Sequence, residues 1–145
     1  MKKTFALFAA IMLALAPAAA DNDKAVTVDQ LPAAARELIS TYFPGETVAY
    51  AKLERDFPES RYEVVFTSSR KLEFKRNGQW TKISCRYSNV PEELVPAGMM
   101  AKVREFYPGA AVTEIERDRR STELKLNNRI EMTFDRNGLL MEIDN

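Results

Sequence analysis

The sequence predicts an α+β protein built as a tandem repeat of one helix plus a four-stranded antiparallel sheet, with the helices packed on one face of the combined sheet. Three observations lead to this expectation. Two segments have the apolar spacing of a helix and end at Pro-Gly, an Arg-Asn-Gly turn occurs twice between apolar runs, and both halves present these signals in the same order. Asn-Gly between alternating apolar residues is the strongest short-range signal for a hairpin.

The two helical segments are LPAAARELISTYFPG, residues 31–45, and VPAGMMAKVREFYPG, residues 95–109. In the first, Leu31, Ala35 and Leu38 lie at the spacing of one helical face, and Val95, Met99 and Val103 follow the same spacing in the second. A proline is tolerated in the first turn of a helix, and Pro-Gly ends it. We therefore expect an amphipathic helix in each half.

The strand signals recur in the same order after each helix. The tripeptide Glu-Arg-Asp at 54–56 returns at 116–118, RYEVVF at 61–66 matches STELKL at 121–126, and KLEFKRNGQWTKI matches EMTFDRNGLLMEI. Such ordered recurrence predicts a duplicated unit. We expect a first repeat at 31–84, a linker at 85–94 with a short helical turn near 91–95, and a second repeat at 95–145.

The N-terminus has the pattern of a secretory signal peptide. Two lysines precede an apolar run, and Ala18 and Ala20 form a small-residue cleavage site before Asp21. The alternative is a membrane anchor, but the apolar run is shorter than the roughly 20 residues that span a bilayer. We expect residues 1–20 to be removed, residues 21–30 to form a loose leader, and the mature chain to be periplasmic or secreted without a membrane span.

Charge and cysteine content narrow the possible functions. Without residues 1–20 the chain has 19 basic and 21 acidic residues, a net charge of −2. A phosphate-binding surface needs clustered basic charge, so nucleic acid is not an expected partner. A single cysteine, Cys85, precludes an intrachain disulfide. Cys85 is either a small buried residue, which we expect first, or an exposed thiol that could link two chains, so a homodimer stays open.

Strand alternation predicts one apolar side of the sheet and one mixed side. If each Arg-Asn-Gly turn places Gly in a bulge, Phe74 faces Trp80 and Phe134 faces Leu140 across their hairpins. Trp80 is then a core residue first and a ligand contact second. The candidate protein-binding residues on the mixed side are Glu63, Val65, Glu73, Thr81, Ile83, Glu131, Met141 and Ile143. The alternative is an ordinary solvent-facing sheet with scattered apolar residues.

No catalytic, cofactor or metal site is expected. The chain has no histidine, the commonest general base and metal ligand. Ser68-Ser69-Arg70-Lys71 matches S-x-x-K, but the accompanying motifs of penicillin-recognising enzymes are missing, and a polar turn is the simpler interpretation. Asp135-Arg136-Asn137-Gly138 has the wrong spacing for an EF-hand and reads as a hairpin turn. Tyr50 and Tyr87 are either core residues or ligand-stacking aromatics.

The ordered motifs together resemble the beta-lactamase-inhibitor-like, PepSY-like domain family of proteins exported by Gram-negative bacteria. The resemblance rests on LP...YFPG, YEV.F, EF..NG.W..I, the second FYPG and F.RNG, and it covers residues 31–143. It implies a fold like that of secreted proteins that inhibit beta-lactamases, with sheets side by side and helices on one face. It further implies a beta-lactamase or a peptidase as the kind of target.

Three functions are compatible with these patterns. The first is an exported non-enzymatic module that binds a protein or peptide through the open sheet face and inhibits a secreted or periplasmic enzyme. The second is a structural or envelope-associated protein without inhibitory activity, in which Cys85 serves dimerisation. The third is an enzyme that uses carboxylates alone. A contiguous apolar patch on the open face favours the first, a uniformly charged face the second, and paired carboxylates in a deep cleft the third.

Overall fold

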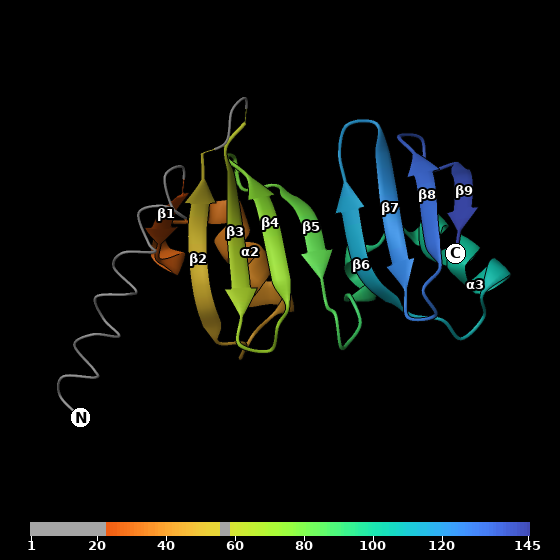
Figure 1. The fold of residues 1–145 in the computed structure, drawn as a ribbon, viewed down its shortest axis with the longest axis horizontal. Helices are drawn as coiled ribbons and strands as arrows, with labels where there is room; N and C mark the ends of the chain where they lie inside the picture. Colours follow the sequence, from red (N-terminus) through yellow and green to blue (C-terminus); the bar gives the residue numbers. More distant parts are fainter. Residues whose placement is uncertain (1–22, 56–58) are drawn as a thin grey trace, which may run out of the picture.

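The computed structural model describes residues 23–55 and 59–145, which form one antiparallel sheet in the strand order β1 to β9 (Figure 1). The predicted signal peptide lies outside the described residues. The strands are β1 (Asp23–Val26), β2 (Val48–Glu54), β3 (Arg61–Phe66), β4 (Lys71–Lys75), β5 (Trp80–Ser84), β6 (Val112–Arg117), β7 (Ser121–Leu126), β8 (Glu131–Asp135) and β9 (Leu140–Asp144). Short 3₁₀ turns at η1 (Val28–Gln30) and η2 (Glu92–Leu94) precede the two α-helices, and η2 confirms the predicted turn.

The expected tandem repeat of a helix plus a four-stranded sheet is wrong, because the strands form a single nine-stranded sheet and the protein is mostly β. β5 and β6 pair directly, with Ile83 opposite Ile115, and the Cys85 N–H donates to the Thr113 carbonyl at 2.7 Å. The hydrogen-bond ladder therefore continues through the centre of the chain. Part of the segment expected to be a loose leader is also ordered, since β1 pairs with β2.

The two helices, α2 (Ala33–Tyr42) and α3 (Ala97–Phe106), lie on the same side of the sheet (Figure 1). Both begin after a proline, and each last turn closes with a hydrogen bond from the residue that follows the helix. Their predicted helical character is confirmed. The apolar faces of β3, β4, β7 and β8 turn toward them, and these faces supply the buried residues Val64, Phe66, Leu72, Phe74, Leu124, Leu126, Met132 and Phe134.

The two Arg-Asn-Gly hairpins have the geometry predicted from the sequence. Gly78 and Gly138 take left-handed φ angles of 91° and 84°, and the register places Phe74 opposite Trp80 and Phe134 opposite Leu140. The second strand of each hairpin then contains one extra residue. Glu73 pairs with Lys82, which leaves Thr81 bulged, and Thr133 pairs with Glu142, which leaves Met141 bulged. A bulge of this kind reverses which residues of the strand face the core.

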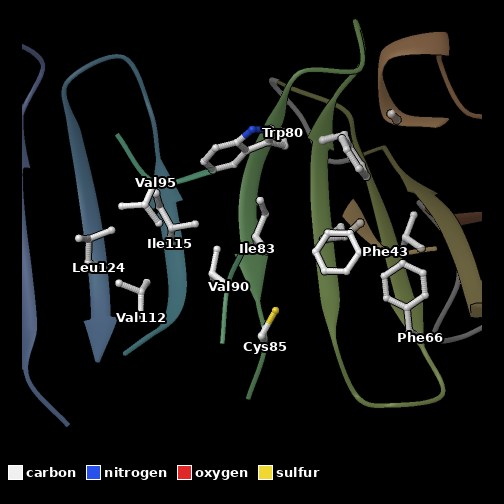
Figure 2. Close-up of a cluster of buried hydrophobic side chains, with 14 of the residues drawn as sticks. Phe43, Phe66, Trp80, Ile83, Cys85, Val90, Val95, Val112, Ile115 and Leu124 are labelled. Carbon is white, nitrogen blue, oxygen red and sulfur yellow. The ribbon is translucent and has the colours of Figure 1, made fainter. Parts of the chain in front are cut away.

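The linker between β5 and α3 packs over the junction of β5 and β6. Val90 and Val95 lie beside Ile115, and the Trp80 indole points from β5 toward β6 (Figure 2). Trp80 is 8 % exposed, which confirms it as a core residue. The Cys85 thiol is free and fully buried, as expected first, and its burial raises its pKa. The packed linker thus joins the buried residues of both halves of the sheet into one core.

Gly78 and Gly138 differ in what surrounds them, which gives a test of how the first hairpin meets α2. A Cβ at residue 78 would lie 2.9 Å from the Pro32 Cβ and 3.0 Å from the Ala34 Cβ, whereas a Cβ at residue 138 would meet nothing within 4 Å. Gly138→Ala should lower the free energy of unfolding by about 1 kcal/mol, the cost of a left-handed alanine. Gly78→Ala should cost at least about 1 kcal/mol more, because the helix must shift.

Urea unfolding monitored by Trp80 fluorescence measures both variants under one condition. Since the two substitutions are chemically identical and both glycines have positive φ, Gly138→Ala is the matched control for backbone strain. Equal losses of stability would show that the hairpin tip does not press on α2.

Candidate functional site

The sheet face turned away from the helices is the candidate site. The strand register aligns one row of side chains across this face, and the row is almost entirely charged: Lys52, Glu63, Glu73, Lys82, Glu116, Glu123, Thr133 and Glu142. A neighbouring row holds Tyr50, Val65, Lys71, Ser84, Glu114, Lys125, Glu131 and Asp144. The contiguous apolar patch considered in the sequence analysis is therefore replaced by charges of both signs.

On β2, β3 and β4 these charges neutralise one another. The Lys52 ammonium lies 3.1 Å from Asp23 and 3.2 Å from Glu54, and the Arg61 guanidinium lies 2.6 Å from Glu54. Burial opposes ionisation of the Glu54 carboxyl, but the hydrogen bonds from Arg61 and Lys52 outweigh burial and hold its pKa below the ordinary value. The pKa of Lys52 is raised: burial lowers it, but the bonds to Asp23 and Glu54 prevail.

Glu63 and Glu73 are buried although they belong to the open face, because cationic side chains cover them. Lys71 lies 3.9 Å from Glu63 and 3.5 Å from Glu73, and the Tyr50 hydroxyl donates to Glu63 at 3.1 Å. Burial and the nearby Glu63 carboxylate raise the pKa of the Tyr50 phenol. Tyr50 is therefore part of this ion-pair cluster, while Tyr87 is 79 % exposed with the Arg86 guanidinium over its ring.

On β6, β7 and β8 acidic side chains are in excess. Lys125 lies 3.2 Å from Glu114 and 3.8 Å from Glu131, but Glu116 and Glu123 stand directly opposite each other in the sheet. Burial, reinforced by the Glu131 carboxylate, raises the pKa of Glu123. Like charges in opposed positions destabilise a sheet. The opposition of Glu116 and Glu123 is therefore an unfavourable contact within this half of the face.

A cleft of about 700 Å³ lies where the two halves of the face meet. It forms because β5 and β6 pair through only three residue pairs, from Ser84 to Lys82, and the bulge at Thr81 then carries β5 away from its neighbour. The cleft is lined by Glu59, Ser60, Arg61, Glu73, Phe74, Lys75, Thr81, Glu116, Arg117, Asp118, Arg119, Arg120, Ser121 and Glu123. Its walls therefore combine guanidinium groups, carboxylates and hydroxyls.

Two local contacts fix the wall that β6 and β7 contribute. The Arg117 guanidinium stacks 3.5 Å from the centre of the Trp80 ring, and its Nε donates to the Trp80 carbonyl at 3.0 Å. Asp118 Oδ1 accepts from the backbone N–H groups of Arg120 at 2.7 Å and Ser121 at 2.9 Å. These two bonds hold the pKa of Asp118 below its ordinary value. The turn that presents Arg119 and Arg120 is thereby fixed at both ends.

The structure separates the predicted binding residues into three groups. Glu63, Val65, Glu73 and Glu131 lie on the open face as expected, and Glu73 and Thr81 also line the cleft. Ile83 is fully buried opposite Leu72, and Ile143 stands opposite the buried Met132, so their placement on the open face was wrong. Thr81 and Met141 occupy the two bulges. The bulges cause the error, since each inserted residue inverts the alternation that follows it.

Sequence reasoning missed the cations and carboxylates that β6 and β7 bring to the cleft. Arg117 ends β6 within the second Glu-Arg-Asp tripeptide, which served in the sequence only as a marker of recurrence. Arg119 and Arg120 lie in the turn that follows, and Glu123 lies in β7. Five consecutive charged residues, Glu116-Arg117-Asp118-Arg119-Arg120, form the densest charge cluster of the chain. This cluster was the sequence signal that could have indicated the charged wall of the cleft. Its nearness to Thr81 follows only from the pairing of β5 with β6.

The other motifs behave as turns. Ser68 donates to Glu46 at 2.8 Å, and Arg70 forms an ion pair with the same carboxylate. Asp135 accepts from the backbone N–H groups of Asn137 and Leu139, as a hairpin turn requires. Within residues 23–55 and 59–145, no group of three or more His, Cys, Asp or Glu side chains is arranged to hold a metal ion.

Among the helices that the structure describes, none has the length and apolar character needed to cross a membrane.

Comparison with known proteins places this geometry among exported bacterial proteins. A family model described as "Putative beta-lactamase-inhibitor-like, PepSY-like" matches residues 60–142. A crystal structure described as a putative calcium-regulated periplasmic protein from Bacteroides thetaiotaomicron is 42 % identical, with a TM-score of 0.84, and the match covers 86 % of this chain and 98 % of that one. The chain has no match among curated proteins.

Two structures from Bacteroides vulgatus are also similar. One, described as a putative periplasmic protein of the DUF2874 family, is 44 % identical, with a TM-score of 0.84 and coverage of 87 % of this chain and 99 % of that chain. The other, described as a putative periplasmic protein of unknown function, is 34 % identical, with a TM-score of 0.80 and coverage of 85 % and 99 %.

Glu54→Gln should destabilise the protein in a pH-dependent way. Because the folded pKa of Glu54 is lowered, its carboxylate stabilises the fold above the ordinary carboxyl pKa, and this contribution is lost as pH falls through the lowered value. We expect the free energy of unfolding to fall by about 1–2 kcal/mol at pH 7 and to change little in strong acid. Urea titrations at both pH values measure it. The control is Glu105→Gln, which removes an exposed pair with Lys102 and should cost almost nothing.

Glu123→Gln should have the opposite effect. The raised folded pKa of Glu123 means that ionisation weakens the fold as pH rises from the ordinary carboxyl pKa through the folded one. The amide should therefore raise the free energy of unfolding by about 0.5 kcal/mol at pH 7 and give no gain in strong acid. The exposed Glu37→Gln on α2 is the control for loss of one negative charge. A gain that persists unchanged at low pH would contradict the assignment to electrostatic strain.

Proposed function

Because the chain belongs to the PepSY-like, beta-lactamase-inhibitor-like family of periplasmic proteins, we propose that it is a non-enzymatic module that binds a protein or peptide through its open sheet face. The observation that carries this proposal is the cleft between β3–β5 and β6–β7, whose lining includes Glu73 and Glu123 of the open face. An inhibitory role toward a secreted or periplasmic enzyme is the specific form that the family description suggests.

The chemistry of the cleft suits a polypeptide partner. The guanidinium groups of Arg119 and Arg120 can donate to carboxylates, and Glu116 and Glu123 can bind cations. The hydroxyls of Thr81 and Ser121 can form hydrogen bonds with peptide groups. A surface with both signs of charge selects a partner by complementarity, which governs specificity and association rate more than affinity. The cleft would then act as the recess that fixes the partner's position on an otherwise shallow face.

The surrounding ion pairs support binding by a preformed surface. Glu54, Glu63 and Glu73 are each held by a cation from a neighbouring strand, so the face next to the cleft loses little freedom when a partner covers it. The Arg117–Trp80 stack fixes the opposite wall in the same manner. A surface organised in advance of binding retains more of its contact energy as affinity.

The state of the nucleophilic and acidic groups supports a non-catalytic role. The Cys85 thiol is buried, and its raised pKa keeps it protonated, whereas a reactive cysteine needs an exposed thiolate. In the cleft, Glu73 is engaged by Arg61 and Lys71, and Asp118 is engaged by the backbone of its own turn. These carboxylates serve structure, which leaves the exposed charges of the cleft for recognition.

A structural role in the cell envelope is the second candidate. It is favoured by the mutual neutralisation of charges on β2, β3 and β4, where few groups remain unengaged for a partner. Dimerisation through Cys85 does not fit this role, because the thiol lies inside the core. The two functions differ in whether the cleft itself is occupied.

A pull-down from periplasmic extract with the mature protein tests the proposal. Thr81→Arg puts a long cation into the cleft, and retention of specific partners should fall at least about tenfold, equivalent to about 1.4 kcal/mol. The matched control, Ser40→Arg, adds the same side chain to the exposed surface of α2 on the helix side and should retain them. Calcium is varied as a second condition, since one structural neighbour is described as calcium-regulated.

The two variants must melt within a few degrees of the parent protein for this comparison to count. Identical partners with Thr81→Arg and with Ser40→Arg would refute binding at the cleft and favour the structural role. If the parent protein captures no specific partner, the binding function itself is refuted.

A further inference from the structure

The last strand of the sheet, β9, has the features of an unfilled pairing position. Within residues 23–55 and 59–145 its only neighbour is β8, so its outer edge offers backbone N–H and C=O groups without a strand beside it. Exposed apolar residues gather there: Leu139 is 65 %, Met141 66 % and Ile143 37 % exposed. An edge with both unpaired backbone groups and apolar side chains is a template for another strand.

The first hairpin shows what completes such an edge. β5 follows its Arg-Asn-Gly turn and bulge as β9 does, with Ile83 and Ile143 in corresponding register opposite Leu72 and Met132. β6 lies against β5, where Ile115 covers Ile83 and Glu116 stands opposite Lys82. Ile83 is consequently fully buried, whereas Ile143 remains partly exposed. β9 thus lacks the aliphatic residue and the charge partner that β6 supplies to β5.

The charges of β9 specify the missing strand. Glu142 takes the place that Lys82 has in β5, and Asp144 faces Glu131 across the sheet. No ion pair in the described part of the chain reaches either Glu142 or Asp144. Because Glu142 and Asp144 alternate with Ile143, a strand beside β9 would be favoured by cations opposite the two carboxylates and an aliphatic residue opposite Ile143.

We propose that β9 accepts an extended segment of a partner protein that alternates lysine or arginine with aliphatic residues, added as a tenth antiparallel strand. Main-chain hydrogen bonds supply the pairing, and the alternation supplies selectivity. The segment lies beyond the sheet edge and does not use the cleft, so this interaction is independent of the function proposed above. A second copy of β9 is a poor occupant, because antiparallel self-pairing sets Glu142 and Asp144 against carboxylates.

Charged residues on an edge strand also protect it from aggregation. Protection and selection are compatible here. Carboxylates repel an acidic edge and lose hydration without compensation against a neutral one, but they attract a cationic edge. An edge that served only for protection would expose few apolar side chains, whereas β9 exposes Met141 and Ile143.

The experiment uses a short blocked peptide that alternates lysine and valine, and a second peptide that alternates glutamate and valine. Binding to the full mature protein is measured by titration, and the site by amide hydrogen exchange. The Lys/Val peptide should bind, slow the exchange of β9 amides and weaken with added salt, while the Glu/Val peptide should not bind. Glu142→Lys with Asp144→Lys should weaken the first peptide at least about tenfold and create binding of the second.

The matched control is Asp29→Lys with Glu37→Lys, which makes the same change in net charge on exposed residues near the other end of the sheet. It should leave both affinities nearly unchanged. Three results would overturn the proposal. They are equal weakening of Lys/Val peptide binding by the two double variants, slowed amide exchange only outside β9, and no binding of the Lys/Val peptide at millimolar concentration. So would protection, in the free protein, of the β9 amides that point away from β8. That result would assign the edge to a second copy if the protein is dimeric and to the chain itself if it is monomeric.

Discussion

The pairing of β5 with β6 is the interaction on which the rest of the structure depends. Only three residue pairs join these strands, yet they convert two groups of strands into one hydrogen-bond ladder and allow one core to run beneath all of it. Ile83 and Ile115 meet at the centre of this junction, and Val90 and Val95 of the linker close over it. Loss of this pairing would expose apolar surface on both sides, so neither half is independent.

The same junction creates the most distinctive feature of the open face. Pairing stops at Lys82 because Thr81 is bulged out of the ladder, and beyond that point the strands separate. Arg117 bridges the gap on one side by stacking on Trp80, and the charged turn after β6 forms the far wall of the cleft. A single inserted residue therefore links the geometry of the fold to the chemistry that it offers a partner.

The errors of sequence interpretation have the same origin. Helix positions, hairpin turns, the buried Trp80 and the open-face positions of Glu63, Glu73 and Glu131 follow from local spacing, and the structure has them as expected. Ile83 was misplaced because the bulge shifts the alternation by one, and a bulge leaves no compositional mark in WTKIS. The ordered recurrence of motifs likewise suggested two units, although the pairing between them makes one sheet.

The sequence by itself determined the two helices, the strands β2 to β9 and the turns between them, because apolar period, proline, glycine and Asn-Gly act over a few residues. It also indicated an exported protein without a histidine-based site. Only the tertiary structure decided that β1 joins the sheet, that β5 continues into β6, and that Arg117, Glu123 and Thr81 share one cleft. These outcomes depend on pairing between distant strands, whose register is set by the packing of a shared core and cannot be read from either strand alone.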